Sequence, residues 1–132
     1  MKILIFGNPL VEVDNLALKM LPKLQKQFPE IDFIYLDPTE NLEEHGKDLK
    51  IIDVVHGIKS PVIITDVNKL SKAKIYSMHD FDLSYNLKLS MQVGKIKTIE
   101  IFGLPWDMKE DEAINYSQSI LRKWVAQDMQ GS

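Results

Sequence analysis

The apolar residues of the chain fall into two patterns, short continuous runs and stripes at helical spacing. Short apolar runs that end at turn-forming residues are typical of buried strands. Five segments share this pattern and are predicted as strands: 3–6, 31–36, 61–66, 74–77 and 97–103. The segment 61–66 is the clearest of them, because it is short, rich in β-branched residues and closed by a polar residue.

Helical spacing, with apolar residues three or four positions apart, appears in three further segments. The predicted helices cover 14–28, 83–91 and 107–125. Asp14 is the predicted N-cap of the first, and Gly94 is a natural stop after the second. Asp107 with Glu110 resembles a capping box at the start of the third. Its predicted buried stripe is Ala113, Ile114, Ser117, Ile120, Leu121, Trp124 and Val125.

Two segments in the first half of the chain carry a weaker pattern. Residues 42–49 have only weak helical character. The run from Ile51 to Val55 is too short for its periodicity to distinguish a helix from a strand. Both assignments therefore stay open at the level of sequence.

The alternation of strands and helices predicts an α/β domain of three layers. We expect a mixed, mainly parallel, five-stranded sheet flanked by helices, of the phosphorylase/hydrolase-like kind. The connection between Asp66 and Ile75 is too short for a crossover helix, so those two strands, if adjacent, would be antiparallel. A single domain over 1–130 is expected, and Gly131-Ser132 could be a cloning remnant.

Composition limits the function classes. The 132 residues carry a net charge of −3 with scattered lysines, which argues against a nucleic-acid partner. The absence of cysteine excludes disulfides, thiolate metal sites and cysteine nucleophiles. No apolar stretch is long enough for a membrane span. We expect a cytoplasmic protein that acts as a monomer.

Three polar residues follow predicted strands and are candidates for a site. Asp14 follows the first strand, Asp66 ends the strand 61–66, and His79 follows the strand 74–77. If these strands end at one edge of the sheet, the two carboxylates and the imidazole would converge there and suit nickel or zinc. Each also has an ordinary structural interpretation, as a helix N-cap, a turn former and a surface residue respectively.

Other catalytic patterns are absent from the sequence. It contains no G-x-G-x-x-G or GK[ST] phosphate loop, no G-x-S-x-G elbow and no H-E-x-x-H helix. Trp106 and Met108 are apolar residues in an otherwise polar loop. They pack on the core or form part of a surface that docks another protein.

Several of these segments together carry a family resemblance. They are the turn Gly7-Asn8-Pro9-Leu10 followed by Asp14, the strand closed by Asp66, the segment Ser77-Met78-His79, and the late strand and loop 97–105. In this order they resemble the hydrogenase maturation endopeptidases, which remove a C-terminal tail from the large subunit of nickel–iron hydrogenases. Two departures mark a divergent member: Ile5 stands where the family has a glycine, and Val13 where it has a second acidic residue.

The resemblance implies an aspartic-type, nickel-dependent endopeptidase whose partner is a hydrogenase large-subunit precursor. Nickel would arrive with the precursor rather than be bound tightly by the free enzyme. Asp14, Asp66 and His79 would be the metal ligands, with Asp14 and Asp66 catalytic and Asp14 the preferred general base.

Two other functions remain open at this stage. One is a non-catalytic chaperone or scaffold that binds a hydrogenase subunit without cutting it. The other is a flavodoxin-like module for a small molecule, in which residues 7–11 would cradle a phosphate.

Overall fold

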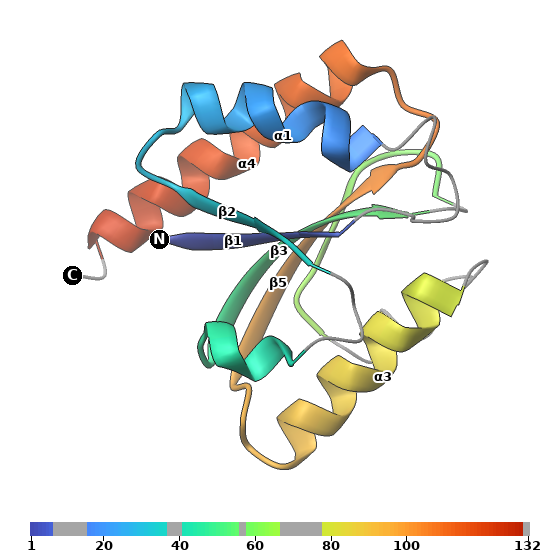
Figure 1. Ribbon diagram of the computed structural model, residues 1–132, viewed down its shortest axis with the longest axis vertical. Helices are drawn as coiled ribbons and strands as arrows, with labels where there is room; N and C mark the ends of the chain where they lie inside the picture. Colours follow the sequence, from blue (N-terminus) through green and yellow to red (C-terminus); the bar gives the residue numbers. More distant parts are fainter. Residues whose placement is uncertain (7–15, 37–40, 56–57, 67–77, 131–132) are drawn as a thin grey trace.

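A five-stranded mixed sheet forms the centre of the molecule (Figure 1). The computed structural model describes residues 1–6, 16–36, 41–55, 58–66 and 78–130, and for Val55 and residues 78–84 it describes the backbone alone. The strands are β1 (Lys2–Phe6), β2 (Asp32–Tyr35), β3 (Asp48–Val55), β4 (Val62–Ile64) and β5 (Thr98–Pro105), in the spatial order β2-β1-β3-β5-β4. The first four in this order are parallel, and β4 is antiparallel to β5. The predicted fold class, a mixed and mainly parallel five-stranded sheet flanked by helices, is confirmed.

Helices α1 (Leu16–Gln27) and α4 (Glu110–Gln130) cover one face of this sheet (Figure 1). Alternate strand residues such as Ile3, Ile5 and Ile52 pack against them. The predicted stripe of α4 is confirmed, since Val125 is half-buried and its other members are buried. No helix in the described ranges is long and apolar enough to cross a membrane.

Helix α3 (Met78–Gln92) and the short 3₁₀ helix η1 (Leu42–His45) cover the opposite face (Figure 1). Here Leu87 packs with sheet residues of the other alternation, such as Leu4 and Ile51. The predicted stop at Gly94 is confirmed: its φ is 79°, and the amide of Lys95 donates to the carbonyl of Ser90 at 2.9 Å. This closure is a Schellman motif, which needs a left-handed residue at that position.

The two segments left open by the sequence are now assigned. Residues 42–45 form η1, while Asp48 and Leu49 already belong to β3, so the weak helix over 42–49 is replaced by a 3₁₀ turn and a strand. The ambiguous run from Ile51 to Val55 is the second half of β3. This strand lies between β1 and β5 and is central to the sheet. Helices cover both faces of the sheet here, which explains its near-continuous apolar run.

The antiparallel pair of the sheet is formed by β4 and β5, with Val62 opposite Gly103 and Ile64 opposite Ile101. The sequence predicted only that 61–66 and 74–77 would be antiparallel if they were adjacent. The predicted strand 74–77 lies outside the described residues. The mixed character of the sheet therefore comes from an edge strand that runs against its neighbour.

The start of α4 also differs from the prediction. The helix begins at Glu110, so the residue before it is Lys109, whose carbonyl accepts a bond from the amide of Ala113 at 2.9 Å. Asp107 lies two residues earlier in a turn, and the predicted capping box is wrong. The first turn of α4 instead carries Glu110, Asp111 and Glu112. The positive end of the helix dipole interacts favourably with these three carboxylates.

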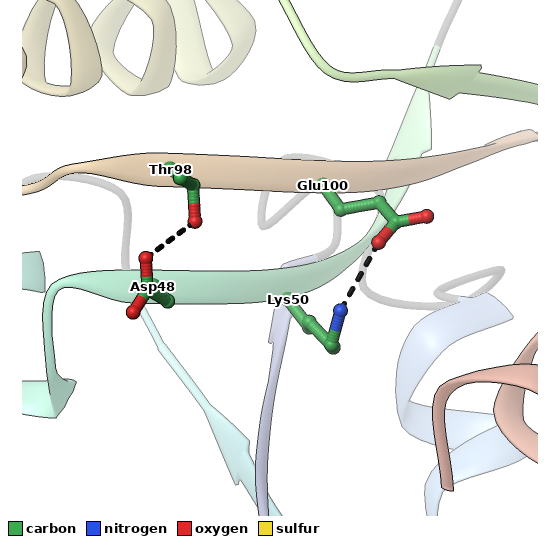
Figure 2. A network of polar contacts seen from close by, with 4 residues as sticks. All are labelled: Asp48, Lys50, Thr98 and Glu100. Carbon is green, nitrogen blue, oxygen red and sulfur yellow. Dashed lines mark hydrogen bonds and ion pairs between the residues drawn. The ribbon is translucent and has the colours of Figure 1, made fainter. Parts of the chain in front are cut away.

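Polar pairs tie β3 to β5 near the beginning of both strands (Figure 2). The hydroxyl of Thr98 donates to Asp48 at 2.6 Å, and the ammonium of Lys50 donates to Glu100 at 3.0 Å. Both pairs join residues directly opposite each other in the register. Cross-strand pairs of this kind help to fix the register of a sheet.

The Glu100 carboxylate lies in a mixed environment. Burial raises its pKa, but the nearby indole of Trp124 and the ammonium groups of Lys50 and Lys123 lower it by more, so the pKa lies below its ordinary value. Lys50 also lies 5.4 Å from the centre of the Trp124 ring, in a cation–π arrangement. This group stabilises the part of the sheet far from the ends of β1 and β3.

Candidate functional site

β1 and β3 are neighbouring parallel strands, and the helices that follow them lie on opposite faces of the sheet. β1 is followed by α1 on one face, whereas β3 is followed by β4 and then by α3 on the other face. Connections that leave neighbouring parallel strands in opposite directions open a crevice at their carboxyl ends, where α/β proteins bind ligands. We call this end of the sheet, where β1, β3 and β5 finish, the carboxyl edge, and the opposite end the amino edge.

A buried carboxylate lies at the carboxyl edge. Asp53 is two residues before Val55, the last residue of β3, and lies directly opposite Phe6, the last residue of β1, and Gly103 of β5. Only 1% of Asp53 is exposed, and it is the sole buried acidic residue among those the structure describes. By strand alternation it faces the layer of α3, as Leu49 and Ile51 do. Burial of a carboxylate is costly unless its charge is compensated, so such a residue at a ligand-binding edge is a candidate for function.

Helix α3 brings His79 toward the same end. The turn around Gly94 joins the end of α3 to the start of β5, and the amide of Lys97 donates to the carbonyl of Lys47 beside the start of β3. The last turn of α3 therefore lies at the amino edge. Its fifteen residues extend about 22 Å, so its first turn, which contains His79, lies toward the carboxyl edge (Figure 1).

Asp66 lies in a different part of the sheet. Because β4 is antiparallel, it begins at Val62, in the row of Asp53 and Gly103, and runs toward the amino edge. Asp66 comes two residues after Ile64 and is exposed. The direction of β4 thus takes the chain away from the ends of β1 and β3 before it reaches Asp66.

Asp14 lies outside the described residues. It belongs to the segment between Phe6 and Leu16, which connects the carboxyl edge to α1. Within the described part of the chain, no three His, Asp or Glu side chains are grouped closely enough to hold a metal ion. Asp14 and the side chain of His79 lie outside that part, so the predicted ligand set stays a prediction.

Sequence reasoning missed Asp53, although a signal was present. An acidic residue interrupts the apolar run Ile51–Val55, and Asp is seldom fully buried unless it is paired or functional. Once this run is assigned as a parallel strand, the acidic residue near its end falls at the carboxyl edge. Because the sequence did not distinguish a helix from a strand here, it did not predict that Asp53 lies at this edge.

Comparison with known proteins shows which solved structures share this fold. No protein-family model and no curated protein matches the sequence. Two solved structures do match the fold. The hydrogenase maturating endopeptidase HybD from E. coli is 18% identical, with a TM-score of 0.60 over 93% of each chain. The chain has the fold of a hydrogenase maturation endopeptidase.

The second match is the solution structure of an endopeptidase from Escherichia coli. It is 18% identical, with a TM-score of 0.57, and covers 80% of this chain and 74% of the other. The resemblance read from the sequence is thus confirmed at the level of the maturation-endopeptidase fold.

A flavodoxin-like sheet, by contrast, has five strands in the order 2-1-3-4-5. Here β5 lies between β3 and an antiparallel β4, so the fold does not favour that alternative.

Proposed function

We propose that this protein is an endopeptidase that removes the C-terminal tail of a nickel-loaded hydrogenase large-subunit precursor. The main support is the likeness of its fold to HybD over 93% of both chains. The motif Gly7-Asn8-Pro9-Leu10 with Asp14, which falls directly after β1, adds to it. The carboxyl ends of β1 and β3 are the expected position for a site in an α/β sheet.

The proposed ligands of the precursor's nickel are Asp14, His79 and one further carboxylate. Asp66 is the residue that the sequence favoured, but it follows β4 toward the amino edge. Asp53 interrupts an apolar run near the end of β3 and lies opposite Phe6 at the carboxyl edge. We therefore propose Asp53 as the second carboxylate, with Asp66 as the alternative that mutation must test. Two carboxylates and an imidazole are suitable donors for a borderline divalent metal.

In this mechanism the nickel belongs to the substrate and supplies a Lewis acid that orients the scissile peptide. Asp14 accepts a proton from the water that attacks the peptide carbonyl. The carbon–nitrogen bond then breaks, and the released amine takes up the proton that Asp14 had accepted. Selection of substrate would depend on nickel as well as sequence, so that cleavage follows cofactor insertion.

The deciding experiment is intact-mass spectrometry of candidate large-subunit precursors incubated with this protein, with and without nickel. We expect loss of a short C-terminal tail from the nickel-loaded form alone. His79→Ala should abolish the loss, whereas His45→Ala, at the end of η1 just before β3 begins, should preserve it. A stable complex without tail loss would instead favour a chaperone or scaffold. The absence of both binding and cleavage would refute the proposal.

A further inference from the structure

Three exposed apolar side chains, which we call the outer stripe, lie along α3. Tyr85, Leu89 and Val93 follow one another at intervals of four residues and are 59%, 47% and 60% exposed. Val93 directly follows α3 and continues its geometry, since its amide donates to the carbonyl of Leu89 at 3.2 Å. At about 100° per residue, the outer stripe lies about 180° from Leu87 and Met91, which pack on the core. A helix that only covers a sheet is polar on its outer side, so an apolar stripe there indicates a partner.

A groove of about 390 Å³ lies beside the outer stripe, between α3 and η1. Leu89 and Val93 line it from the side of α3, and Leu42 lines it from η1. The rest of its lining is polar: Asn41, Glu43, Asn86, Ser90 and Lys95. The two charged side chains of the lining, Glu43 and Lys95, pair with each other at 3.7 Å. The groove therefore widens the apolar stripe and borders it with hydrogen-bonding groups, an arrangement typical of protein interfaces.

The segment that carries the outer stripe is positively charged. Residues 85–97 contain Lys88, Lys95 and Lys97 and no acidic residue. Lys95 pairs with Glu43, whereas neither Lys88 nor Lys97 forms an ion pair within the described part of the chain. Electrostatic complementarity therefore favours a partner whose apolar residues are flanked by carboxylates.

The outer stripe extends away from the proposed site on the same helix. His79 lies in the first turn of α3, toward the carboxyl edge, and Tyr85 comes six residues later, about 9 Å along the helix axis. From Tyr85 to Val93 the stripe continues for about 12 Å toward the amino edge. The substrate of the proposed function is a whole protein subunit rather than a free peptide, so it must contact a surface next to the site where its tail is cut. The outer side of α3 is such a surface.

We propose that the outer stripe of α3 and the adjoining groove dock an amphipathic helix of the precursor that carries carboxylates beside its apolar residues. This inference rests on the proposed function for the identity of the partner. A helix fits this surface because side chains spaced by one turn along a stripe match the i, i+3, i+4 and i+7 anchors of a facing helix. The surface holds the folded precursor while its tail crosses the carboxyl edge, and it takes no part in the chemical step.

The first test measures docking without cleavage. The probe is nickel-free precursor, whose dissociation constant for the immobilised protein is measured by surface plasmon resonance. Leu89→Glu places a carboxylate in the middle of the outer stripe, so the constant should rise at least about tenfold, and Lys88→Glu should also raise it. The control Tyr116→Glu adds the same charge at a side chain that is 49% exposed on α4, on the other face of the sheet, and should leave the constant unchanged. Equal affinities of wild type and Leu89→Glu, or no binding by the wild type, would overturn the inference.

The second test separates docking from the protease activity. With nickel-loaded precursor, Leu89→Glu should raise KM about tenfold and leave kcat nearly unchanged, because the outer stripe acts in binding alone. Cleavage by Leu89→Glu with the KM of the wild type would refute the docking surface and retain the protease. Docking that Leu89→Glu abolishes, without any cleavage by the wild type, would refute the protease and retain the surface. A wild-type dimer that Leu89→Glu converts to a monomer, measured by light scattering after gel filtration, would show that a second copy covers the stripe and would overturn the inference.

Discussion

Asp53 lies directly opposite Phe6 in the register of β3 and β1. A carboxylate that is 1% exposed is thereby placed beside the point where β1 ends and the chain leaves for α1. Burial of a carboxylate is costly unless its charge is compensated. A buried acidic residue at the carboxyl edge of a parallel sheet is therefore a candidate for a functional group.

The first prediction compares the two candidate carboxylates. Asp53→Asn keeps the size of the side chain but removes its charge, so we expect tail removal to slow about 100-fold or more. Asp66→Asn, toward the amino edge, should retain most of the activity. The measurement is the initial rate of tail loss from a nickel-loaded precursor by intact-mass spectrometry.

Both variants must be compared at equal concentrations of folded protein, judged by circular dichroism and the midpoint of thermal unfolding. The reverse result, with Asp66→Asn inactive and Asp53→Asn active, would restore the ligand set that the sequence predicted. It would also mean that the residues after β4 return to the carboxyl edge.

Strand β3 shows how far the sequence could define the fold. The class of the fold follows from the alternation of apolar runs and helical stripes, which local physics sets along most of the chain. The run Ile51–Val55 resisted assignment because five residues give too little periodicity. Its strand conformation depends on pairing with β1 and β5, which lie far away in the sequence. Information of that kind is tertiary, and a local pattern does not contain it.

The candidate site was harder to predict because the composition of a strand does not indicate whether it runs parallel or antiparallel to its neighbour. Val62–Ile64 has the β-branched pattern of a buried strand, and Asp66 follows it as a polar residue would at a ligand-binding edge. The same pattern fits a strand that runs either way, and β4 runs against β5. The direction of β4 therefore decides toward which edge of the sheet the carboxylate that follows it lies.

The second prediction concerns a buried hydroxyl in α4. Ser117 is fully buried, and its hydroxyl has no hydrogen-bond partner among the described residues. Ser117→Ala removes this unsatisfied group and introduces a better helix former, so the free energy of unfolding should rise by about 1 kcal/mol. Urea denaturation followed by circular dichroism would measure the change.

Ser119→Ala is the matched control for that substitution. Ser119 lies two residues further along α4, is exposed, and donates to the carbonyl of Asn115 at 3.4 Å. Its replacement should change the free energy of unfolding by no more than about 0.5 kcal/mol. Destabilisation by Ser117→Ala would show that its hydroxyl is satisfied in solution.

The third prediction follows from the lowered pKa of Glu100. Because its pKa in the folded state lies below the unfolded value, the unfolded chain binds more protons in the interval between them. The ionised side chain therefore stabilises the fold above the ordinary glutamate pKa, and this stabilisation disappears as the pH falls through the folded value. The difference in free energy of unfolding between wild type and Glu100→Gln should be larger at neutral pH than in acid.

Urea midpoints measured from neutral pH down to strongly acidic pH would test this dependence. Lys50 supplies part of the effect, since its ammonium donates to Glu100 at 3.0 Å. In a Lys50→Met background, burial opposes fewer stabilising charges, so the effect of adding Glu100→Gln should depend less on pH. A difference that is constant with pH in the otherwise wild-type protein would contradict the lowered pKa.

The last prediction isolates backbone conformation at the end of α3. Gly94 has a φ of 79°, and a Cβ atom built there would meet nothing within 4 Å. Gly94→Ala therefore adds no clash, and its effect comes from the left-handed conformation that alanine avoids. We expect the free energy of unfolding to fall by about 1 kcal/mol, and Gly94→Asn to cost less because asparagine tolerates this conformation. Urea denaturation of the two variants would measure both costs, and equal stability of Gly94→Ala and wild type would mean that the turn after α3 can close without a left-handed residue.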